Sequence, residues 1–210
     1  MSFRDRTDAG RRLAARLVEA HLSDPFILAL PRGGVPVAAE VALALHAPLE
    51  VFVARKIGTP GHEELGIGAV AEGLEEPVLS DDARRHGITV GNVRRLADRQ
   101  RDELRRRVDL YRGDRALPPL EGRDVVLIDD GLATGVTAEA ALLSLRVQKP
   151  SRLVLAVPVA ARDTVARLAH IADEVITLEA PRHFYAVGQA YGNFTQTTDE
   201  EVLELLSRRN

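Results

Sequence analysis

Short apolar segments alternate with longer segments of helical periodicity along most of this chain, and this alternation restricts the fold more than any other feature. The apolar segments are too short for helices and are typical of strands buried in a parallel sheet. We therefore expect five buried strands. They lie at residues 26–30, 49–54, 124–130, 152–158 and 174–178.

Segments with apolar residues at helical spacing precede or separate these strands, at residues 8–22, 35–47, 137–147 and 163–170. A regular exchange of strand and helix is the pattern of βαβ units, whose crossovers cover a parallel sheet with helices. The sequence therefore predicts an α/β fold with a central, mainly parallel sheet flanked by helices on both faces. Ligands of such sheets bind beyond the carboxyl ends of the strands.

Three segments do not follow this alternation. Residues 55–68 are rich in glycine, proline and charge and predict a loop. Residues 80–115 are strongly polar and predict a helical insertion, in which 89–113 forms a long exposed helix with arginines paired to acidic neighbours. Residues 180–210 hold four of the eight aromatic residues and form a variable, hood-like region, which either stacks on a ligand or packs on the core. Residues 1–210 are expected to form one domain.

The composition excludes several classes of protein. The chain has no cysteine, which rules out disulfides, thiolate metal sites and thiol nucleophiles. A formal net charge of −3 provides no general attraction to nucleic acid. No apolar run has the length of a membrane span, and the first residues lack the apolar core of a signal peptide. We expect a cytoplasmic protein that binds neither nucleic acid nor membrane.

Residues 125–137, VVLIDDGLATGVT, are the most informative segment. Asp129 and Asp130 end an apolar strand, where two adjacent carboxylates need solvent, a cation or hydroxyl donors as partners. The turn after them opens a helix, where unpaired amides and the hydroxyls of Thr134 and Thr137 favour a phosphate. Simple capping is the alternative, but a cap needs neither both acids nor the whole TGVT turn. The hydroxyls and the 5′-phosphate of a ribose suit the two halves of the segment.

This segment resembles the phosphoribosyl pyrophosphate (PRPP) signature of type I phosphoribosyltransferases. The resemblance implies that Asp129 and Asp130 hold the ribose and orient a hydrated Mg²⁺, which is bound mainly by ligand oxygens and water. The other PRPP-binding residues that it implies are Gly131, Ala133, Thr134, Gly135, Val136 and Thr137.

A second segment, LPRGGVP at residues 30–36, resembles the pyrophosphate-binding loop of the same family. The resemblance implies that Arg32 and the backbone of Gly33 and Gly34 hold the diphosphate, a role suited to a guanidinium fork and to closely approaching amides. It also predicts a cis peptide bond between Pro31 and Arg32. A plain turn from strand to helix is the alternative for this segment taken alone.

A third segment, residues 55–68, is placed like the flexible catalytic loop of the family. The resemblance implies that Arg55 and Lys56, together with Arg32, meet the charge that develops on the leaving diphosphate. Lys56 and Lys149 are the only lysines of an arginine-rich chain, so composition does not explain Lys56. A solvated strand end is the alternative.

The resemblance implies a Mg²⁺-dependent glycosyltransferase of nucleotide metabolism, which moves the 5-phosphoribosyl group of PRPP to a small nitrogenous acceptor and releases diphosphate. Ala133 stands where members that act on 6-oxopurines carry an acid, so the acceptor is left open. A homodimer is expected because many relatives are dimers. The alternatives are a non-catalytic sensor of PRPP or a nucleotide at the same site, and hydrolysis with water as the acceptor. Arg32 and Lys56 favour the enzyme.

Overall fold

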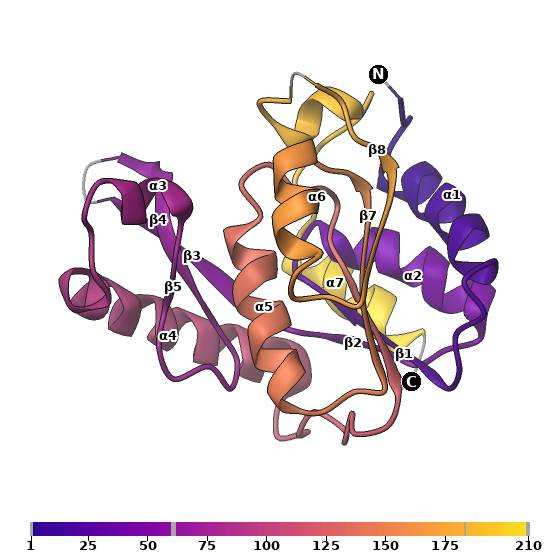
Figure 1. The fold of residues 1–210 in the computed structure, drawn as a ribbon. Helices are drawn as coiled ribbons and strands as arrows, with labels where there is room; N and C mark the ends of the chain where they lie inside the picture. The colour runs from indigo at the N-terminus through magenta and orange to yellow at the C-terminus, as the bar shows by residue number, and fades with distance from the viewer. Residues whose placement is uncertain (1, 60–61, 183, 209–210) are drawn as a thin grey trace.

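Five parallel strands form the main sheet of the computed structural model, which describes residues 2–59, 62–182 and 184–208 (Figure 1). The strand order is β2-β1-β6-β7-β8, so β6 lies at the centre with β1 and β7 beside it. The predicted α/β fold with a parallel sheet is confirmed. The strands are β1 Pro25–Ala29, β2 Leu49–Val51, β6 Asp124–Ile128, β7 Arg152–Val159 and β8 Glu174–Glu179.

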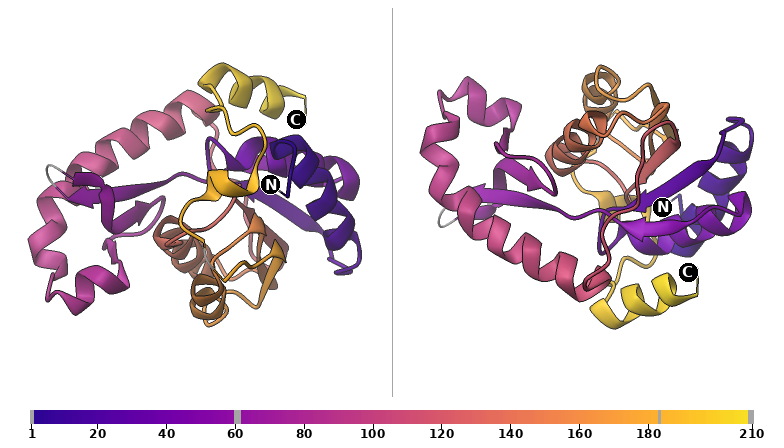
Figure 2. Two further views of the ribbon diagram at one scale, coloured as in Figure 1. Left: turned by 90° about the horizontal axis from the view of Figure 1, so that it is seen from above. Right: turned by 90° about the horizontal axis from the view of Figure 1, so that it is seen from below.

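Helices cover both faces of this sheet, as expected from strands that are apolar on both sides (Figure 2). In β1, Ile27 and Ala29 point into a core shared with α1 and α2, while Phe26 and Leu28 point into a core shared with α5 and α6. Alternate residues of one strand thus bury on opposite faces. The helices are α1 Arg6–Val18, α2 Gly34–Leu45, α5 Val136–Val147 and α6 Arg162–Leu168.

A second, antiparallel sheet projects from the main body together with two helices, and we call this unit of residues 54–112 the wing (Figure 2). The prediction that 55–68 is a loop is wrong for residues 55–59 and 62–68, which form strands, while residues 60 and 61 lie outside the described residues. In β3 only Ile57 is fully buried, so apolar and polar residues need not alternate along it and the sequence carries no strand signal. The register of its pairing with β4 also shifts beside Gly58. The wing elements are β3 Ala54–Thr59, β4 His62–Ala71, β5 Val78–Leu79, α3 Asp81–Arg85 and α4 Val90–Arg112.

Helix α4 is the long charged helix that the sequence predicts. Its arginines form ion pairs with acidic residues one turn away, such as Arg101 with Asp98 and Arg106 with Glu103. The hydrogen bond from Arg106 lowers the pKa of Glu103 to about 2. The predicted pairing on a solvated helix is therefore confirmed. At the end of α4, the buried Arg112 forms an ion pair with Glu72 within the wing and donates to the carbonyl of Val51 in β2, which joins the wing to the main sheet.

The C-terminal region fastens the N-terminal segment. Tyr191 packs between Phe3 and Phe194, with ring centroids 5.4 Å and 5.0 Å apart, so these aromatic residues belong to the packing. Helix α7, Asp199–Ser207, was not predicted, although Thr198 and Glu201 form a capping box that marks its start. It packs beside α2. Among the described residues, no helix is both long and apolar enough to cross a membrane.

Candidate functional site

Two largely buried carboxylates lie where the central strand β6 ends. Asp129 and Asp130 follow Ile128, the last residue of the strand, and the amide of Asp130 donates a hydrogen bond of 2.9 Å to Oδ1 of Asp129. Burial raises the pKa of both carboxyls, and the neighbouring charge of Asp130 raises that of Asp129 further. The pair therefore favours partners that stabilise its negative charge, such as a cation or hydroxyl donors.

Arg6 is such a partner, and sequence reasoning missed it. Its Nε donates to Oδ2 of Asp130 at 2.8 Å, and the two side chains are only 12% and 13% exposed. The guanidinium also donates to the carbonyl of Thr195 and lies 4.0 Å from the ring centroid of Phe194. Nothing near Arg6 in the sequence points to this role, because its partner lies 124 residues further along.

The loop after β1 packs directly against these carboxylates. The peptide bond between Pro31 and Arg32 is cis, as predicted. A Cβ atom on Gly33 would lie 2.0 Å from Oδ2 of Asp130, and one on Gly34 would lie 2.7 Å from the carbonyl oxygen of Ile128. Only glycine allows this approach, so both predicted glycines shape the contact between the loop and the acids.

The backbone amides of the 31–34 loop and the side chain of Arg32 have different partners. The amides of Gly34 and Val35 donate to the carbonyls of Leu30 and Arg32, which precede α2, whereas no hydrogen bond from the amides of Arg32 and Gly33 occurs within the described residues. These two amides are available for an anion. The guanidinium of Arg32 lies 3.7 Å from Asp199, at the first residue of α7.

Arg55 and Lys56 are neighbours in β3 but point to opposite faces of the wing sheet. Nε of Arg55 donates to Gln100 of α4 at 3.2 Å. Burial lowers the pKa of Arg55, and the positive charges of Arg107, Arg106 and Arg32 lower it further, while the charge of Glu103 opposes them. The side chain of Lys56 instead lies over Gly66 of β4. The positive charge of Arg32 thus acts on Arg55, whereas Lys56 lies on the other face of the wing sheet.

The 133–137 turn presents a row of amides at the start of α5. No hydrogen bond from the amides of residues 133–137 occurs within the described residues. The carbonyls point the other way, because Oγ1 of Thr164 donates to Ala133 at 2.6 Å and Arg167 donates to Thr134. Gly135 adopts a φ of 67°, a left-handed conformation that suits glycine. The turn is thus an open anion site at a helix N-terminus.

The other predicted residues of this segment surround the turn. Gly131 packs against Val159 and Val187, where a Cβ would lie within 2.9 Å of both side chains. Val136 is buried in the core, and Thr137 is half-buried in the first turn of α5. The segment thus holds its backbone in place through buried residues and leaves Thr134 exposed.

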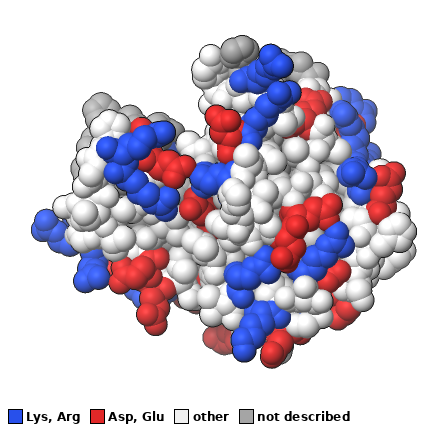
Figure 3. Space-filling view, in the orientation of Figure 1, with Lys and Arg blue, Asp and Glu red and all other residues white. Residues whose placement is uncertain are grey.

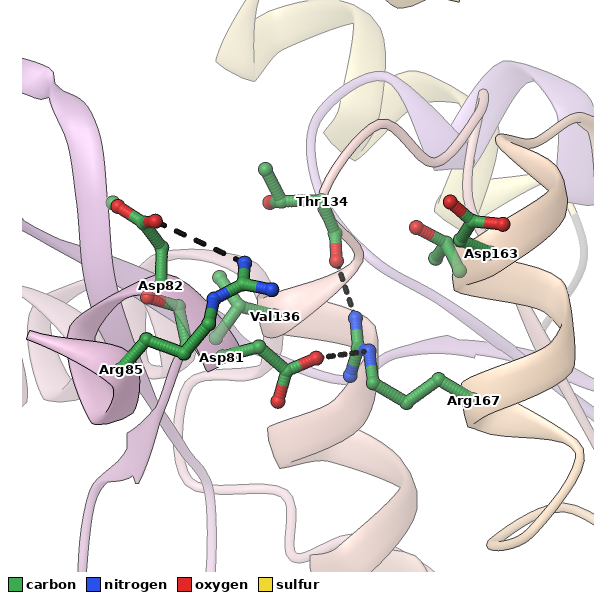
Figure 4. Close-up of a pocket in the computed structure, with 10 residues that line it drawn as sticks. Asp81, Asp82, Arg85, Thr134, Val136, Asp163 and Arg167 are labelled. Carbon is green, nitrogen blue, oxygen red and sulfur yellow. Dashed lines mark hydrogen bonds and ion pairs between the residues drawn. The ribbon is translucent and has the colours of Figure 1, made fainter. Parts of the chain in front are cut away.

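Two of the cavities near these residues lie beside the 133–137 turn and beyond the ends of β7 and β8. One of about 510 Å³ lies where the 133–137 turn meets α3 and α6, and Thr134, Asp81 and Arg167 line it (Figure 4). A second, of about 240 Å³, lies beyond β7 and β8, between Arg162 and Phe184. The surface is notched between the wing and the main body, with charges of both signs along the notch (Figure 3).

The donor set for a metal at this site is small. Among the described residues, no group of three His, Asp or Glu side chains is placed to hold an ion. Asp129 and Asp130 offer two adjacent carboxyls beside the open amides of the 31–34 loop and the 133–137 turn. One or two carboxylates supplemented by substrate phosphates are the usual surroundings of Mg²⁺. These residues therefore fit a Mg²⁺ ion that arrives with a phosphorylated ligand.

The fold and this site define a family. A profile of the phosphoribosyl transferase domain matches residues 4–192. The chain therefore belongs to the phosphoribosyl transferase domain family.

Individual relatives agree with this assignment. A Mycobacterium tuberculosis protein named "Putative phosphoribosyl transferase" is 47% identical over 206 residues, covering 98% of this chain and 46% of that protein. The chain thus spans about half the length of the curated relatives it matches. The crystal structure of TT1426 from Thermus thermophilus is 47% identical, with a TM-score of 0.82 and coverage of 100% of this chain and 99% of that one. The AQ2163 protein of Aquifex aeolicus, 14% identical over 87% of this chain and 78% of its own, shares the fold with a TM-score of 0.54.

Proposed function

We propose that this chain transfers the 5-phosphoribosyl group of PRPP to a nitrogenous acceptor and releases diphosphate. The observation that supports this proposal most is the order of the strands in the main sheet. The 31–34 loop follows β1, the two acids follow β6, and the cavity between Arg162 and Phe184 lies beyond β7 and β8. The diphosphate leaves the anomeric carbon on the side opposite to the incoming acceptor, and this sheet edge has a site on either side of the acids.

Each part of the edge has a role in this reaction. The amides of the 133–137 turn bind the 5′-phosphate, and the carboxylates of Asp129 and Asp130 accept hydrogen bonds from the ribose hydroxyls. The bond from the anomeric carbon to the diphosphate oxygen breaks, and a bond to the acceptor nitrogen forms while that nitrogen loses a proton. The amides of Arg32 and Gly33 stabilise the negative charge on the diphosphate. Arg32 and Arg55 add positive charge nearby.

Mg²⁺, when bound with PRPP, neutralises part of the charge on the diphosphate. Asp129 and Asp130 would hold it through water and the ribose hydroxyls. Lys56, which lies on the other face of the wing sheet, stays a predicted catalytic residue in this proposal.

The chemistry of the second cavity suggests the class of acceptor. Arg162, Asp163 and Arg182 supply charged groups, and the ring of Phe184 supplies an aromatic wall. Nε of Arg162 donates to the carbonyl of Ala180, which holds the two sides of the cavity together. A flat, polar nitrogen heterocycle would stack on the ring and use the charged groups for hydrogen bonds.

We expect Mg²⁺-dependent binding of PRPP that is lost when both carboxylates are replaced. In the double variant Asp129→Asn, Asp130→Asn, shape is preserved but the acceptors for the ribose hydroxyls and hydrated ion are weakened, so PRPP affinity should fall at least about 100-fold. Titration calorimetry with and without Mg²⁺ measures this. The double variant Asp98→Asn, Asp102→Asn on the exposed face of α4 removes the same charge and should bind PRPP normally.

Two further results separate the alternatives. Release of diphosphate with one of a panel of nitrogen heterocycles supports the transferase, and release of ribose 5-phosphate without any acceptor supports hydrolysis. Tight PRPP binding without turnover would favour the non-catalytic sensor of PRPP, and the absence of PRPP binding at millimolar concentration would refute the transferase, hydrolysis of PRPP and the PRPP sensor, and leave a sensor of a nucleotide. The homodimer and the cytoplasmic location predicted from the sequence stay predictions.

A further inference from the structure

Arg167 is the most highly connected side chain around the larger cavity. From α6, its guanidinium reaches Glu139 of α5, the carbonyl of Thr134 and Asp81 of α3, the last with an Nε to Oδ2 distance of 3.2 Å. Figure 4 shows it pointing from α6 toward Thr134 and Asp81. One residue thus contacts the 133–137 turn, the helix that follows the turn, and the wing.

The carbonyl contact decides where the turn directs its amides. A peptide unit is planar and trans, so its carbonyl and its N–H point in opposite directions. By binding the carbonyl of Thr134, Arg167 directs the amide of Gly135 away from α6. Thr164, which is buried, does the same for the preceding peptide, because its hydroxyl binds the carbonyl of Ala133 and thereby directs the amide of Thr134.

We propose that Arg167 is a positioning residue for the 5′-phosphate, which holds the 133–137 turn by the carbonyl of Thr134 so that the amides of the turn face the ligand. Thr164 supports the same turn through the carbonyl of Ala133. The inference rests on the proposed function, because it assigns the phosphate of the phosphoribosyl ligand to this turn. Arg167 does not itself touch the phosphate.

The test separates ligands that carry the 5′-phosphate from one that lacks it. Removing Arg167 alone would leave the buried carboxylate of Glu139 without its main partner, so the informative comparison is Glu139→Gln against the double variant Glu139→Gln, Arg167→Met. Relative to Glu139→Gln, the double variant should bind ribose 5-phosphate about tenfold more weakly, while binding of magnesium diphosphate stays the same. Thr164→Val should weaken ribose 5-phosphate binding about fivefold with the same selectivity.

Arg146 provides a matched control within the same pair of helices. Like Arg167, it contacts both a carboxylate and a backbone carbonyl, here those of Asp173 and Ile171. It lies in the last turn of α5, whereas the contacts of Arg167 are at the start of that helix. Arg146→Met should bind both ligands normally. Equal weakening of both ligands in the Arg167 double variant, or no change in either, would overturn the inference. Failure of the native chain to bind ribose 5-phosphate would refute the proposed function as well, and this is seen before any variant is measured.

Discussion

Replacing Gly33 with alanine should abolish high-affinity PRPP binding while leaving the fold intact. The added Cβ would lie 2.0 Å from Oδ2 and 2.6 Å from Cγ of Asp130, so this carboxylate must rotate away from the loop. The backbone of Gly33 is right-handed, with φ of −63°, so alanine adds no backbone strain. A displacement of about 1 Å at such a site lowers affinity or rate on the order of 100-fold.

Calorimetry with PRPP and Mg²⁺ measures this loss, and thermal unfolding measures the accompanying destabilisation, which we expect to be about 1–3 kcal/mol. Gly91→Ala is the matched control. A Cβ at Gly91, in the first turn of α4, meets only Oγ1 of Thr89 at 3.7 Å. This variant should bind PRPP normally and gain about 0.5–1 kcal/mol of stability. Normal PRPP binding by Gly33→Ala would refute the assigned contact between the loop and Asp130.

Arg6→Met should be strongly destabilising. It removes the cation from an ion pair whose side chains are only 12% and 13% exposed. Asp130 then lies beside Asp129, and no other guanidinium among the described residues binds either carboxylate. Breaking a buried ion pair in this way costs about 3–5 kcal/mol. Denaturant unfolding at neutral pH measures the loss. Arg16→Met, which breaks an exposed pair with Glu19 on the same helix, should change stability by about 1 kcal/mol or less.

The loss caused by Arg6→Met should also depend on pH. Burial raises the pKa of Asp130, while Arg6 limits the rise. When the pKa of a carboxyl is raised in the folded state, its contribution to stability is present below the unfolded pKa, near about 3.9, and is lost as the pH rises through the folded value. Without Arg6 the folded pKa rises further, so the deficit should grow as the pH rises from the folded pKa of the native protein toward the higher folded pKa of the variant. A deficit of constant size would show that Arg6 acts through packing alone.

Much of the site could be predicted because it is encoded locally. The 125–137 segment contains the strand, both acids and the 133–137 turn in one continuous run, so spacing alone places them at the end of β6. The glycines of the 31–34 loop and its cis peptide were likewise predicted from a short motif. Arg6, Thr164 and Arg167 were missed because each reaches the site through contacts with residues 28 to 124 positions away.

The sequence by itself determined the α/β class, because the periodicity of apolar residues reports which faces of a strand or helix are buried. It also determined the long charged helix, since α4 carries its own ion pairs one turn apart. Only the tertiary structure decided that residues 55–59 and 62–68 form strands. The segment lacks a regular alternation of apolar and polar residues. Its two strands are held by pairing with each other and by packing on α4 and α5. The same holds for the charge balance at Asp130, which depends on an arginine from the other end of the chain, because electrostatic partners are chosen by distance in space and leave no periodic trace in the sequence.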